Sequence, residues 1–237
     1  MAQRMQACTA CHGKEGRAAP DGYYPRIAGK PAGYLYNQLL NLRDGRRHYA
    51  LMSELLQPLS DDYLREIAEY FAALELPYPP PARAEPRADA QRAQQLATRG
   101  DEAAGIPACS SCHGKALTGR APQIPGLLGL PRDYLNGQLG AWRSGERQAQ
   151  TPDCMAKIAR ALSPEDLNAL THWLAAQPLP GDTRPTREAP VAWPQPCGGV
   201  PASLLQATSS PPASSPTSSA APVNAARPAP QRSGAQR

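Results

Sequence analysis

The pentapeptide Cys-x-x-Cys-His occurs twice in this 237-residue chain, as CTACH at residues 8–12 and as CSSCH at residues 109–113. Two thiols at this spacing lie about one helical turn apart, so both can add to the vinyl groups of one porphyrin while the adjacent His binds its iron. The motif is typical of covalent attachment of c-type haem, and two copies predict two haems. The predicted attachment residues are Cys8, Cys11, Cys109 and Cys112, and the predicted proximal ligands are His12 and His113.

A Cys-x-x-Cys pair also occurs in zinc sites and in thioredoxin-like redox sites. Zinc would need further ligands at suitable spacing, and the chain has only two more cysteines, Cys154 and Cys197. A thioredoxin-like site would need a βαβ pattern, which the sequence does not show. Repetition of the whole pentapeptide favours haem over both alternatives.

The two motifs begin a longer internal repeat. With a shift of 101, residues 8–14 match residues 109–115; with a shift of 100, residues 25–47 match residues 125–147; with a shift of 103, residues 52–60 match residues 155–163. Only small slips in register separate these blocks. The repeat therefore predicts two copies of one small fold.

Each copy predicts the same elements in the same order. A Gly/Pro-rich loop is followed by a helix that starts at a Pro and ends at a Gly, then by a short Met-bearing loop and a last helix capped by Ser. No stretch alternates with period two, so we expect an all-α fold. The expected loops are 13–31 and 114–131, the middle helices 32–44 and 132–144, and the last helices begin at Ser60 and Ser163.

The expected organisation is two tandem small helical domains, a linker and a tail. Residues 1–76 form the first domain, with its N-terminal helix expected to be truncated, and residues 88–178 form the second. Residues 77–87 read as a stiff Pro-rich linker, and residues 179–237 as a Pro/Ser/Ala-rich, largely disordered tail. Domains this small bury little apolar surface, and a covalently held haem would supply the missing core.

Charge and hydropathy exclude some classes of protein. The formal charge is +5, three units of it in the tail, and no basic stripe with interleaved aromatics suggests a nucleic-acid site. No apolar run is long enough to span a membrane, although peripheral association stays open. Bacterial c-type haem is attached outside the cytoplasmic membrane, whereas the first motif follows Met1 almost at once. We therefore expect a missing upstream signal peptide and a periplasmic location.

The sixth iron ligand is predicted from the matched methionines Met52 and Met155. Their equivalent positions in the repeat favour ligation over simple core filling, and His/Met ligation closes both axial positions and raises the reduction potential. His48 and His172 are weaker rivals without counterparts. Cys154, next to Met155, is an alternative thiolate ligand or a disulfide partner of Cys197.

Pro25 and Pro125 follow the two ligating histidines by thirteen and twelve residues. Each backbone carbonyl can accept a hydrogen bond from the imidazole N–H and so fix the ring. A rigid loop turn explains the same two prolines equally well.

Taken together, CxxCHGK, the segments YLYNQL (34–39) and YLNGQL (134–139), the Arg-x-Gly that follows, and the later Met and Leu-Ser resemble class I cytochromes c. The duplication resembles the di-haem cytochrome c4 family over residues 3–178. The resemblance implies two cytochrome c folds about a pseudo-two-fold axis and His/Met ligation of both irons. The long tail and Cys154 depart from the family pattern.

The function implied is that of a periplasmic electron carrier rather than an enzyme. Its expected partners are a cytochrome bc1-type or dehydrogenase donor and a terminal oxidase acceptor. Two alternatives stay open. In the first, the chain is a haem subunit of a periplasmic dehydrogenase. In the second, it is a di-haem enzyme that uses Cys154 or an open iron, for thiosulfate oxidation or peroxide reduction.

Overall fold

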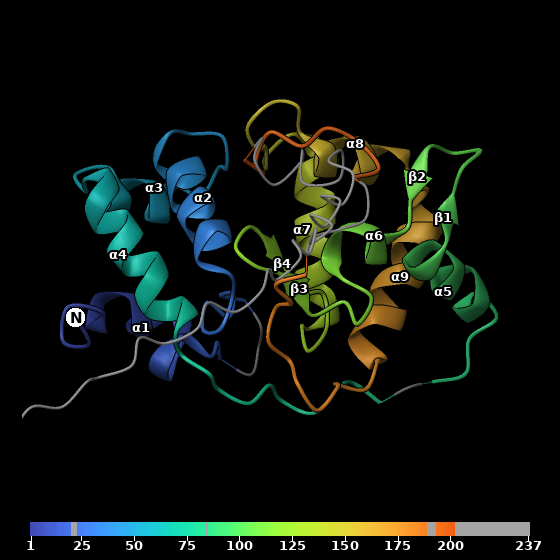
Figure 1. Cartoon of the computed structure of the whole chain (residues 1–237), viewed down its shortest axis with the longest axis horizontal. Coiled ribbons are helices and arrows are strands. Elements are labelled where there is room, and N and C mark those ends of the chain that lie inside the picture. The colour runs from blue at the N-terminus through green and yellow to red at the C-terminus, as the bar shows by residue number, and fades with distance from the viewer. Residues whose placement is uncertain (20–22, 84, 189–192, 202–237) are drawn as a thin grey trace, which may run out of the picture.

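The computed structural model describes residues 1–19, 23–83, 85–188 and 193–201, and this part of the chain is mostly helical. Two halves lie side by side, the N-terminal half drawn in blue to teal and the C-terminal half in green to orange (Figure 1). The first half contains α1 (Gln6–His12), the 3-10 turn η1 (Lys14–Gly16), α2 (Ala32–Arg43), α3 (Ala50–Leu56) and α4 (Asp61–Ala72). The second contains α5 (Ala90–Thr98), α6 (Cys109–His113), α7 (Arg132–Ser144), α8 (Cys154–Ala161) and α9 (Pro164–Ala176).

The middle and last helices of each half begin where the sequence predicts. Pro31 and Pro131 directly precede α2 and α7, and the helix α7 ends at Gly145 with φ +88°, a left-handed conformation that suits glycine. Ser60 and Ser163 cap α4 and α9, the Ser163 hydroxyl accepting a hydrogen bond from the Asp166 N–H at 3.0 Å.

Two features of the second half differ from the all-α expectation. Strands β1 (Gly100–Asp101) and β2 (Ile106–Pro107) pair antiparallel, as do β3 (Gly119–Arg120) and β4 (Ile124–Pro125). Each strand has two residues, too few to show a period-two pattern. They shape the loops that carry the haem motif and the following proline.

The two methionines lie on helices, so the prediction that they lie in loops is wrong. Met52 lies in α3 and Met155 in α8, helices of seven and eight residues. Segments this short show little periodicity in the sequence. The start of α8 is fixed by Asp153, whose carboxylate accepts a hydrogen bond from the Ala156 N–H at 3.0 Å.

Each half has a hydrophobic core of its own. The first core lies between α2 and α4, and the second between α5, α7 and α9. The buried members of the first are Met5, Leu35, Leu42, Leu56, Leu64, Ile67, Ala68 and Phe71. Those of the second are Leu96, Ala97, Ile106, Leu117, Leu128, Leu130, Leu135, Leu162, Leu170, Leu174 and Ala175.

Residues 77–83 and 85–88 connect the halves without helix or strand. The Arg26 guanidinium donates to the Pro77 carbonyl at 3.1 Å and lies 4.0 Å from the centre of the Tyr78 ring. Farther along, the Ala82 N–H donates to the Ala175 carbonyl at 3.0 Å. The connection therefore contacts both halves.

The C-terminal region was expected to be largely disordered, yet its described residues lie on the second half. Thr186 forms an isolated β-bridge with Arg120, and Cys197 forms a disulfide with Cys154. For residues 189–192 and 202–237, the same expectation falls outside the described part of the chain.

Contacts between the halves follow the internal repeat. Arg47 and Arg147 form an antiparallel β-bridge. Beside it the His48 N–H donates to the Glu146 carbonyl at 2.8 Å, and the Gln148 N–H donates to the Arg46 carbonyl at 2.7 Å. The two hydrogen bonds exchange under a shift of 100 residues, as a pseudo-two-fold axis through the bridge requires. No helix in the described residues is long and apolar enough to cross a membrane.

Candidate haem sites

The two predicted proximal histidines lie at the C-terminal ends of α1 and α6 and are both buried. His12 Nδ1 donates a hydrogen bond to the Pro25 carbonyl at 2.8 Å, and His113 Nδ1 donates to the Pro125 carbonyl at 2.7 Å. These are the hydrogen bonds that the spacing of the prolines suggested. They fix each ring and leave Nε2 as the nitrogen that can bind a metal.

Burial keeps both imidazoles in the neutral form. It lowers the pKa of His12 and of His113, and the hydrogen bond to the proline carbonyl offsets only part of this effect. The positive charge of Arg47 lowers the pKa of His12 further. A neutral imidazole is the form that coordinates iron.

The four motif cysteines form no disulfide and are half-buried. Burial raises the pKa of the Cys8 thiol, and it raises the pKa of Cys109 and of Cys112 to about 11. The nearby charge of Arg120 opposes this rise at Cys112. The uncharged thiols of Cys8, Cys109 and Cys112, each in a motif with a buried imidazole, fit thioether attachment to a porphyrin.

In the second half, one mainly apolar cavity is lined by Cys109, Cys112, His113 and Met155 together. Pro125 lines it as well. The structure therefore places two thiols, an imidazole and a thioether around one space, the donor set of a His/Met c-type haem. In the first half, Cys8 and Met52 both pack against the first core.

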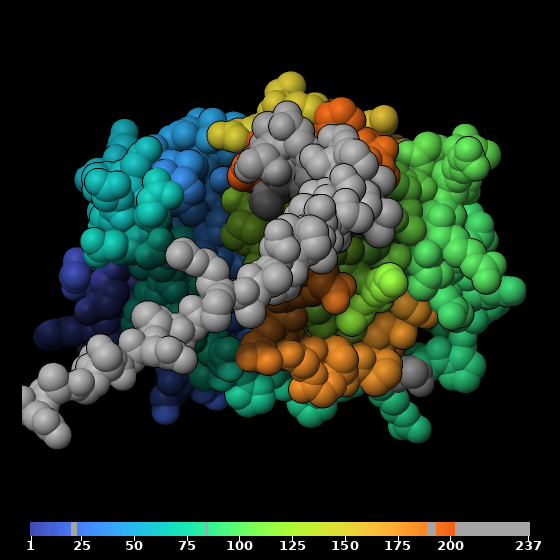
Figure 2. Space-filling model, viewed as in Figure 1, coloured from blue at the N-terminus to red at the C-terminus, as the bar shows by residue number. Residues whose placement is uncertain are grey.

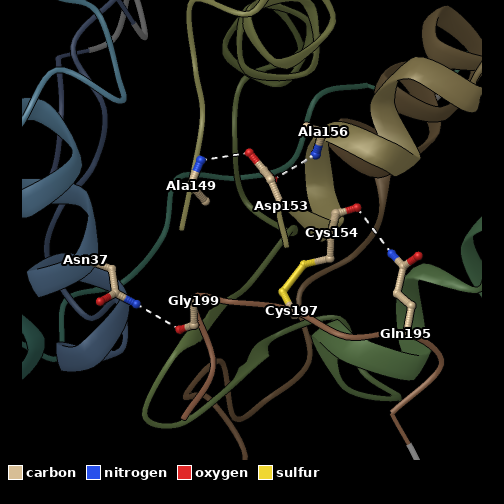
Figure 3. Close-up of a disulfide and its surroundings, with 8 residues drawn as sticks. All are labelled: Asn37, Ala149, Asp153, Cys154, Ala156, Gln195, Cys197 and Gly199. Atoms are coloured by element: carbon tan, nitrogen blue, oxygen red, sulfur yellow. Dashed lines mark hydrogen bonds between the residues drawn. A yellow bond between two sulfur atoms is a disulfide. The ribbon is translucent and has the colours of Figure 1, made fainter. Parts of the chain in front are cut away.

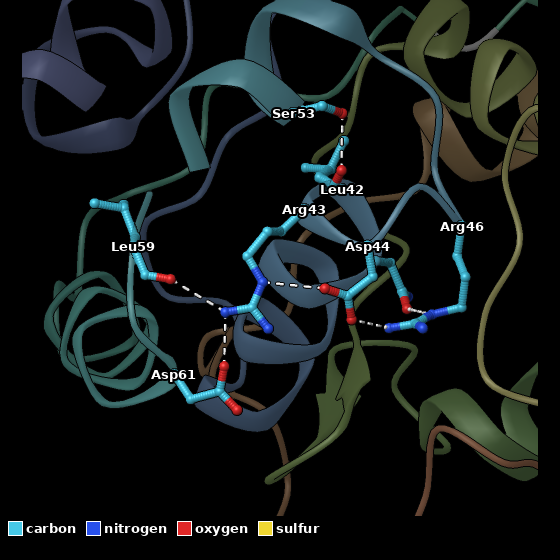
Figure 4. A network of polar contacts seen from close by, with 8 residues as sticks. Leu42, Arg43, Asp44, Arg46, Ser53, Leu59 and Asp61 are labelled. Atoms are coloured by element: carbon cyan, nitrogen blue, oxygen red, sulfur yellow. Dashed lines mark hydrogen bonds and ion pairs between the residues drawn. The ribbon is translucent and has the colours of Figure 1, made fainter. Parts of the chain in front are cut away.

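Hydrogen bonds hold α3 and α8, the helices that carry Met52 and Met155, in place. They come from side chains to which the sequence analysis assigned no role. The Ser53 hydroxyl of α3 donates to the Leu42 carbonyl of α2 at 2.8 Å (Figure 4). Arg43 of α2 donates to the Leu59 carbonyl at 3.1 Å and to the Asp61 carboxylate at 2.6 Å (Figure 4).

The second half repeats the arginine anchor. Arg143 of α7 donates to the Ala159 carbonyl at 3.0 Å and also to the Leu162 carbonyl. Leu162 is the repeat equivalent of Leu59. The matched arginines were visible in the sequence repeat, but their targets lie in turns whose position only the fold determines.

The rival ligands are placed elsewhere. His48 is exposed, and His172 is half-buried on α9 outside the cavity lining. Cys154 is bonded to Cys197 across a Cα–Cα distance of 5.0 Å (Figure 3). The disulfide alternative is thus the one observed, and Cys154 has no free thiolate with which to replace Met155.

At the contact between the halves, a buried arginine side chain lines the second cavity. Arg147 is buried, and it lines the cavity together with Trp142, whose ring centre lies 3.7 Å from the guanidinium. The side chains that the Arg47 and Arg147 guanidiniums contact in the described chain carry no formal charge. They are Gln38, Gln138, Tyr34 and Tyr134.

The indole nitrogen Nε1 of Trp142 is buried without a hydrogen-bond partner in the described part of the chain. Buried donors and uncompensated guanidiniums beside an apolar space call for an anionic acceptor. The two propionates of a haem are such acceptors, so the residues of the second half fit the group on both its apolar and its charged side.

Known proteins are similar to this chain over most of its length, although no protein-family model matches it. A "thiosulfate dehydrogenase electron acceptor" of Thiomonas intermedia is 38% identical over 183 residues, covering 77% of this chain and 82% of the relative. A cytochrome c4 of Pseudomonas aeruginosa is 35% identical over 173 residues, covering 72% and 84%. The crystal structure of reduced recombinant cytochrome c4 from Pseudomonas stutzeri has a TM-score of 0.63 at 31% identity, covering 73% and 95%.

Proposed function

Because this chain belongs to the cytochrome c4 family of di-haem c-type electron carriers, we propose that it works in the periplasm between a thiosulfate dehydrogenase and a terminal oxidase. The family carries two covalently bound haem c groups. The proposed donor is taken from the relative of Thiomonas intermedia, which is named as the electron acceptor of that enzyme.

In the proposed sites, each half holds one haem through two cysteines, one histidine and one methionine. Each haem supplies one-electron redox chemistry at its iron. The Pro25 and Pro125 carbonyls orient the imidazoles, and the helices α3 and α8 present the thioethers. The first set is Cys8, Cys11, His12 and Met52, and the second is Cys109, Cys112, His113 and Met155.

One observation carries the proposal: the second cavity gathers a complete His/Met haem ligand set, and the repeat supplies the same residues in the first half. A histidine and a methionine that both bind the iron would leave no open position for peroxide, which supports a carrier over a peroxidase. The disulfide at Cys154 supports a carrier over an enzyme that uses a cysteine ligand.

A second candidate is favoured by the same relative. An electron acceptor named after its dehydrogenase can also stay bound to it as a haem subunit. Purification of the tagged chain from its native periplasm distinguishes the two functions. A stable complex with the dehydrogenase indicates a subunit, and a free cytochrome that the enzyme reduces in solution indicates a carrier.

The ligand assignment is tested by absorption spectra of the periplasmically matured protein. Methionine ligation of ferric haem gives a weak band at about 695 nm. We expect Met52→Ala and Met155→Ala each to remove half of this band, and the double variant to remove all of it. Met5→Leu is the control, because Met5 is a buried core residue next to α1. A full band in either alanine variant would refute the assignment.

The donor is tested by stopped-flow mixing of the oxidised protein with thiosulfate-reduced thiosulfate dehydrogenase. We expect reduction of both haems, with the rate rising in proportion to enzyme concentration. Failure to reduce a protein that shows the full 695 nm band would refute the donor and leave the di-haem sites intact.

A further inference from the structure

A C-terminal segment of residues 193–201, here called the strap, lies against the start of α8, the helix that carries Met155 (Figure 3). It is fixed at Cys197 by the disulfide to Cys154, the residue directly before Met155. The Gln195 side chain donates to the Cys154 carbonyl at 3.2 Å, and the Gly198 N–H donates to the Pro152 carbonyl at 2.9 Å.

The strap forms one wall of the second cavity. Gln195, Cys197, Gly199 and Val200 line it together with Met155, and Val200 is buried. At Gly198 an added Cβ would lie 2.4 Å from the Thr151 carbonyl oxygen, so the backbone lies directly on the loop before α8.

The strap also reaches the first half. The Asn37 side chain of α2 donates to the Gly199 carbonyl at 2.9 Å (Figure 3). In the space-filling view its orange residues lie at the surface beside the yellow residues that precede α8 (Figure 2). The methionine face of the second half is therefore closed by the chain itself.

The equivalent face of the first half is open and apolar. Under the shift of 103 that relates the two methionines, Leu51 stands where Cys154 stands, and Leu55 where Ile158 stands. Leu51 is 54% exposed and Leu55 is 44% exposed on α3, and Tyr49 directly before α3 is 38% exposed. Ile158, in contrast, is half-buried and lines the second cavity.

A chain of aromatic side chains leads from this open face to the first proximal ligand. A hydrogen bond with Tyr49 raises the pKa of Tyr23, which is 68% exposed. The Tyr23 ring meets the Tyr24 ring edge-on at 4.9 Å, and the Tyr24 ring lies 6.1 Å from the His12 ring. The repeat places Gln123 and Ile124 at the corresponding positions of the second half, so the aromatic chain belongs to the first half alone.

From these observations we infer that the surface formed by Tyr23, Tyr49, Leu51 and Leu55, here called the α3 patch, is where a redox partner protein docks, and that the strap closes the matching face of the second half. The occupant is a protein with an apolar patch around its own one-electron centre. Exposed apolar clusters of this kind mark interaction sites, and the strap shows that the repeated fold accepts a covering chain at this position. This inference rests on the proposed carrier function and adds the docking surface to it.

The step itself is a simple electron transfer. One electron would leave the partner's centre, which is oxidised, and would reduce the haem iron that His12 would hold, with no bond formed or broken. Electron exchange between the two haem sites would then take place inside the molecule, across the contact between the halves.

The test uses a reduced blue-copper protein as the electron donor in stopped-flow mixing with the full-length, haem-loaded chain. We expect Leu51→Glu/Leu55→Glu to slow the second-order rate by about tenfold or more, because the substitutions put charge into the centre of the contact. The control Gln91→Glu/Gln94→Glu adds the same charge on the exposed face of α5 and should keep the rate. Equal slowing in both variants, or in neither, would overturn the proposal.

Releasing the strap tests the second claim of the inference, that the strap covers the matching face. Cys154→Leu/Cys197→Ser removes the disulfide and gives position 154 a leucine, the residue that the first half has at the equivalent position, Leu51. Added to Leu51→Glu/Leu55→Glu, this change should restore most of the lost rate by exposing the second face. A combined variant as slow as Leu51→Glu/Leu55→Glu would show that the strap is not a cover.

Two further readouts identify the occupant. Backbone amide shifts on adding the copper protein should fall on residues 49–56 and not on residues 152–159. Concentration-dependent dimerisation through the patch would assign it to a second copy, and shifts that appear only after residues 202–237 are cleaved off would assign it to the tail. Either result would overturn the proposal.

Each variant is first checked for the band at about 695 nm. Loss of that band in the unmodified chain speaks against the proposed function, whereas a full band with unchanged rates speaks only against the docking surface.

Discussion

Trp142 carries a buried donor for which the described chain offers no acceptor. Because its indole lines the second cavity, we expect Nε1 to donate to a haem propionate when the group is bound. Removing that donor leaves more negative charge on the propionate and favours the ferric state. Trp142→Phe should therefore lower the reduction potential of the second haem by about 40 mV, the equivalent of one hydrogen bond of about 1 kcal/mol.

Potentiometric titration followed at the haem absorption bands measures this shift. The repeat equivalent of Trp142 is Leu42, which has no donor, so the potential of the first haem is the internal reference. Equal shifts in both potentials, or none, would mean that Trp142 does not contact the second haem.

Some residues of the candidate sites could be predicted from the sequence, and others could not. The contacts between the histidines and their proline partners could be predicted because they depend on local spacing, and His12–Pro25 and His113–Pro125 pair as that spacing suggested. Haem attachment at the motif cysteines stays a prediction. Trp142 could not, because an unpartnered donor is a property of the tertiary environment.

Among the elements, the short helix α8 depends on an arginine from its neighbour α7. Arg143 donates to the Ala159 and Leu162 carbonyls at the end of α8, which Asp153 caps at its start. Removing the guanidinium leaves those carbonyls without a charged donor. We expect Arg143→Gln to lower the free energy of unfolding by about 1.5 kcal/mol and to weaken Met155 ligation first.

Guanidinium titration of the ferric protein checks this expectation at two wavelengths. Half of the band at about 695 nm should disappear at lower denaturant than the far-ultraviolet helix signal does. Arg160→Gln on the exposed side of α8 is the control and should unfold like the unmodified protein. Coincident loss of both signals in Arg143→Gln would contradict the role assigned to Arg143.

Elements of regular length were predictable and short ones were not. The helices α2, α4, α7 and α9 have Pro, Ser and Gly at their ends and an apolar stripe, which is why the sequence locates them. The helices α3 and α8 and the two-residue strands have too few turns or pleats to show a period. Their positions come from tertiary anchors such as Arg143 and from the disulfide at Cys154.

At the scale of the whole molecule, the repeat produces a contact with approximate two-fold symmetry, and positive charge is concentrated at this contact. The bridge between Arg47 and Arg147 brings two guanidiniums together, and Tyr34 lies against them, its hydroxyl accepting from Arg147 at 3.2 Å. The resemblance to the di-haem cytochrome c4 family implied the symmetry. The repeat did not predict the strap, which has no copy in the first half.

Tyr34 makes this contact sensitive to pH. Burial raises the pKa of its hydroxyl, but the positive charges of Arg147, Lys30 and Arg47 outweigh burial and lower the pKa to about 8. Loss of the proton as pH rises through about 8 places a negative charge between the halves, which favours the ferric over the ferrous state. We therefore expect both reduction potentials to fall as the pH rises from about 7 to about 9.

Potentiometric titrations at several pH values test this coupling with two matched variants. Tyr34→Phe removes the titrating hydroxyl and should make both potentials flat across this range. Tyr134→Phe changes the repeat equivalent, which contacts Arg47, and should keep the fall, because the lowered pKa belongs to Tyr34. Potentials that fall equally in Tyr34→Phe would assign the proton to another group, and potentials that are flat in the unmodified protein would show that Tyr34 stays protonated between the halves. The charge of one tyrosine at the symmetry axis then sets the driving force for both haems at once, because the axis places it in contact with both halves.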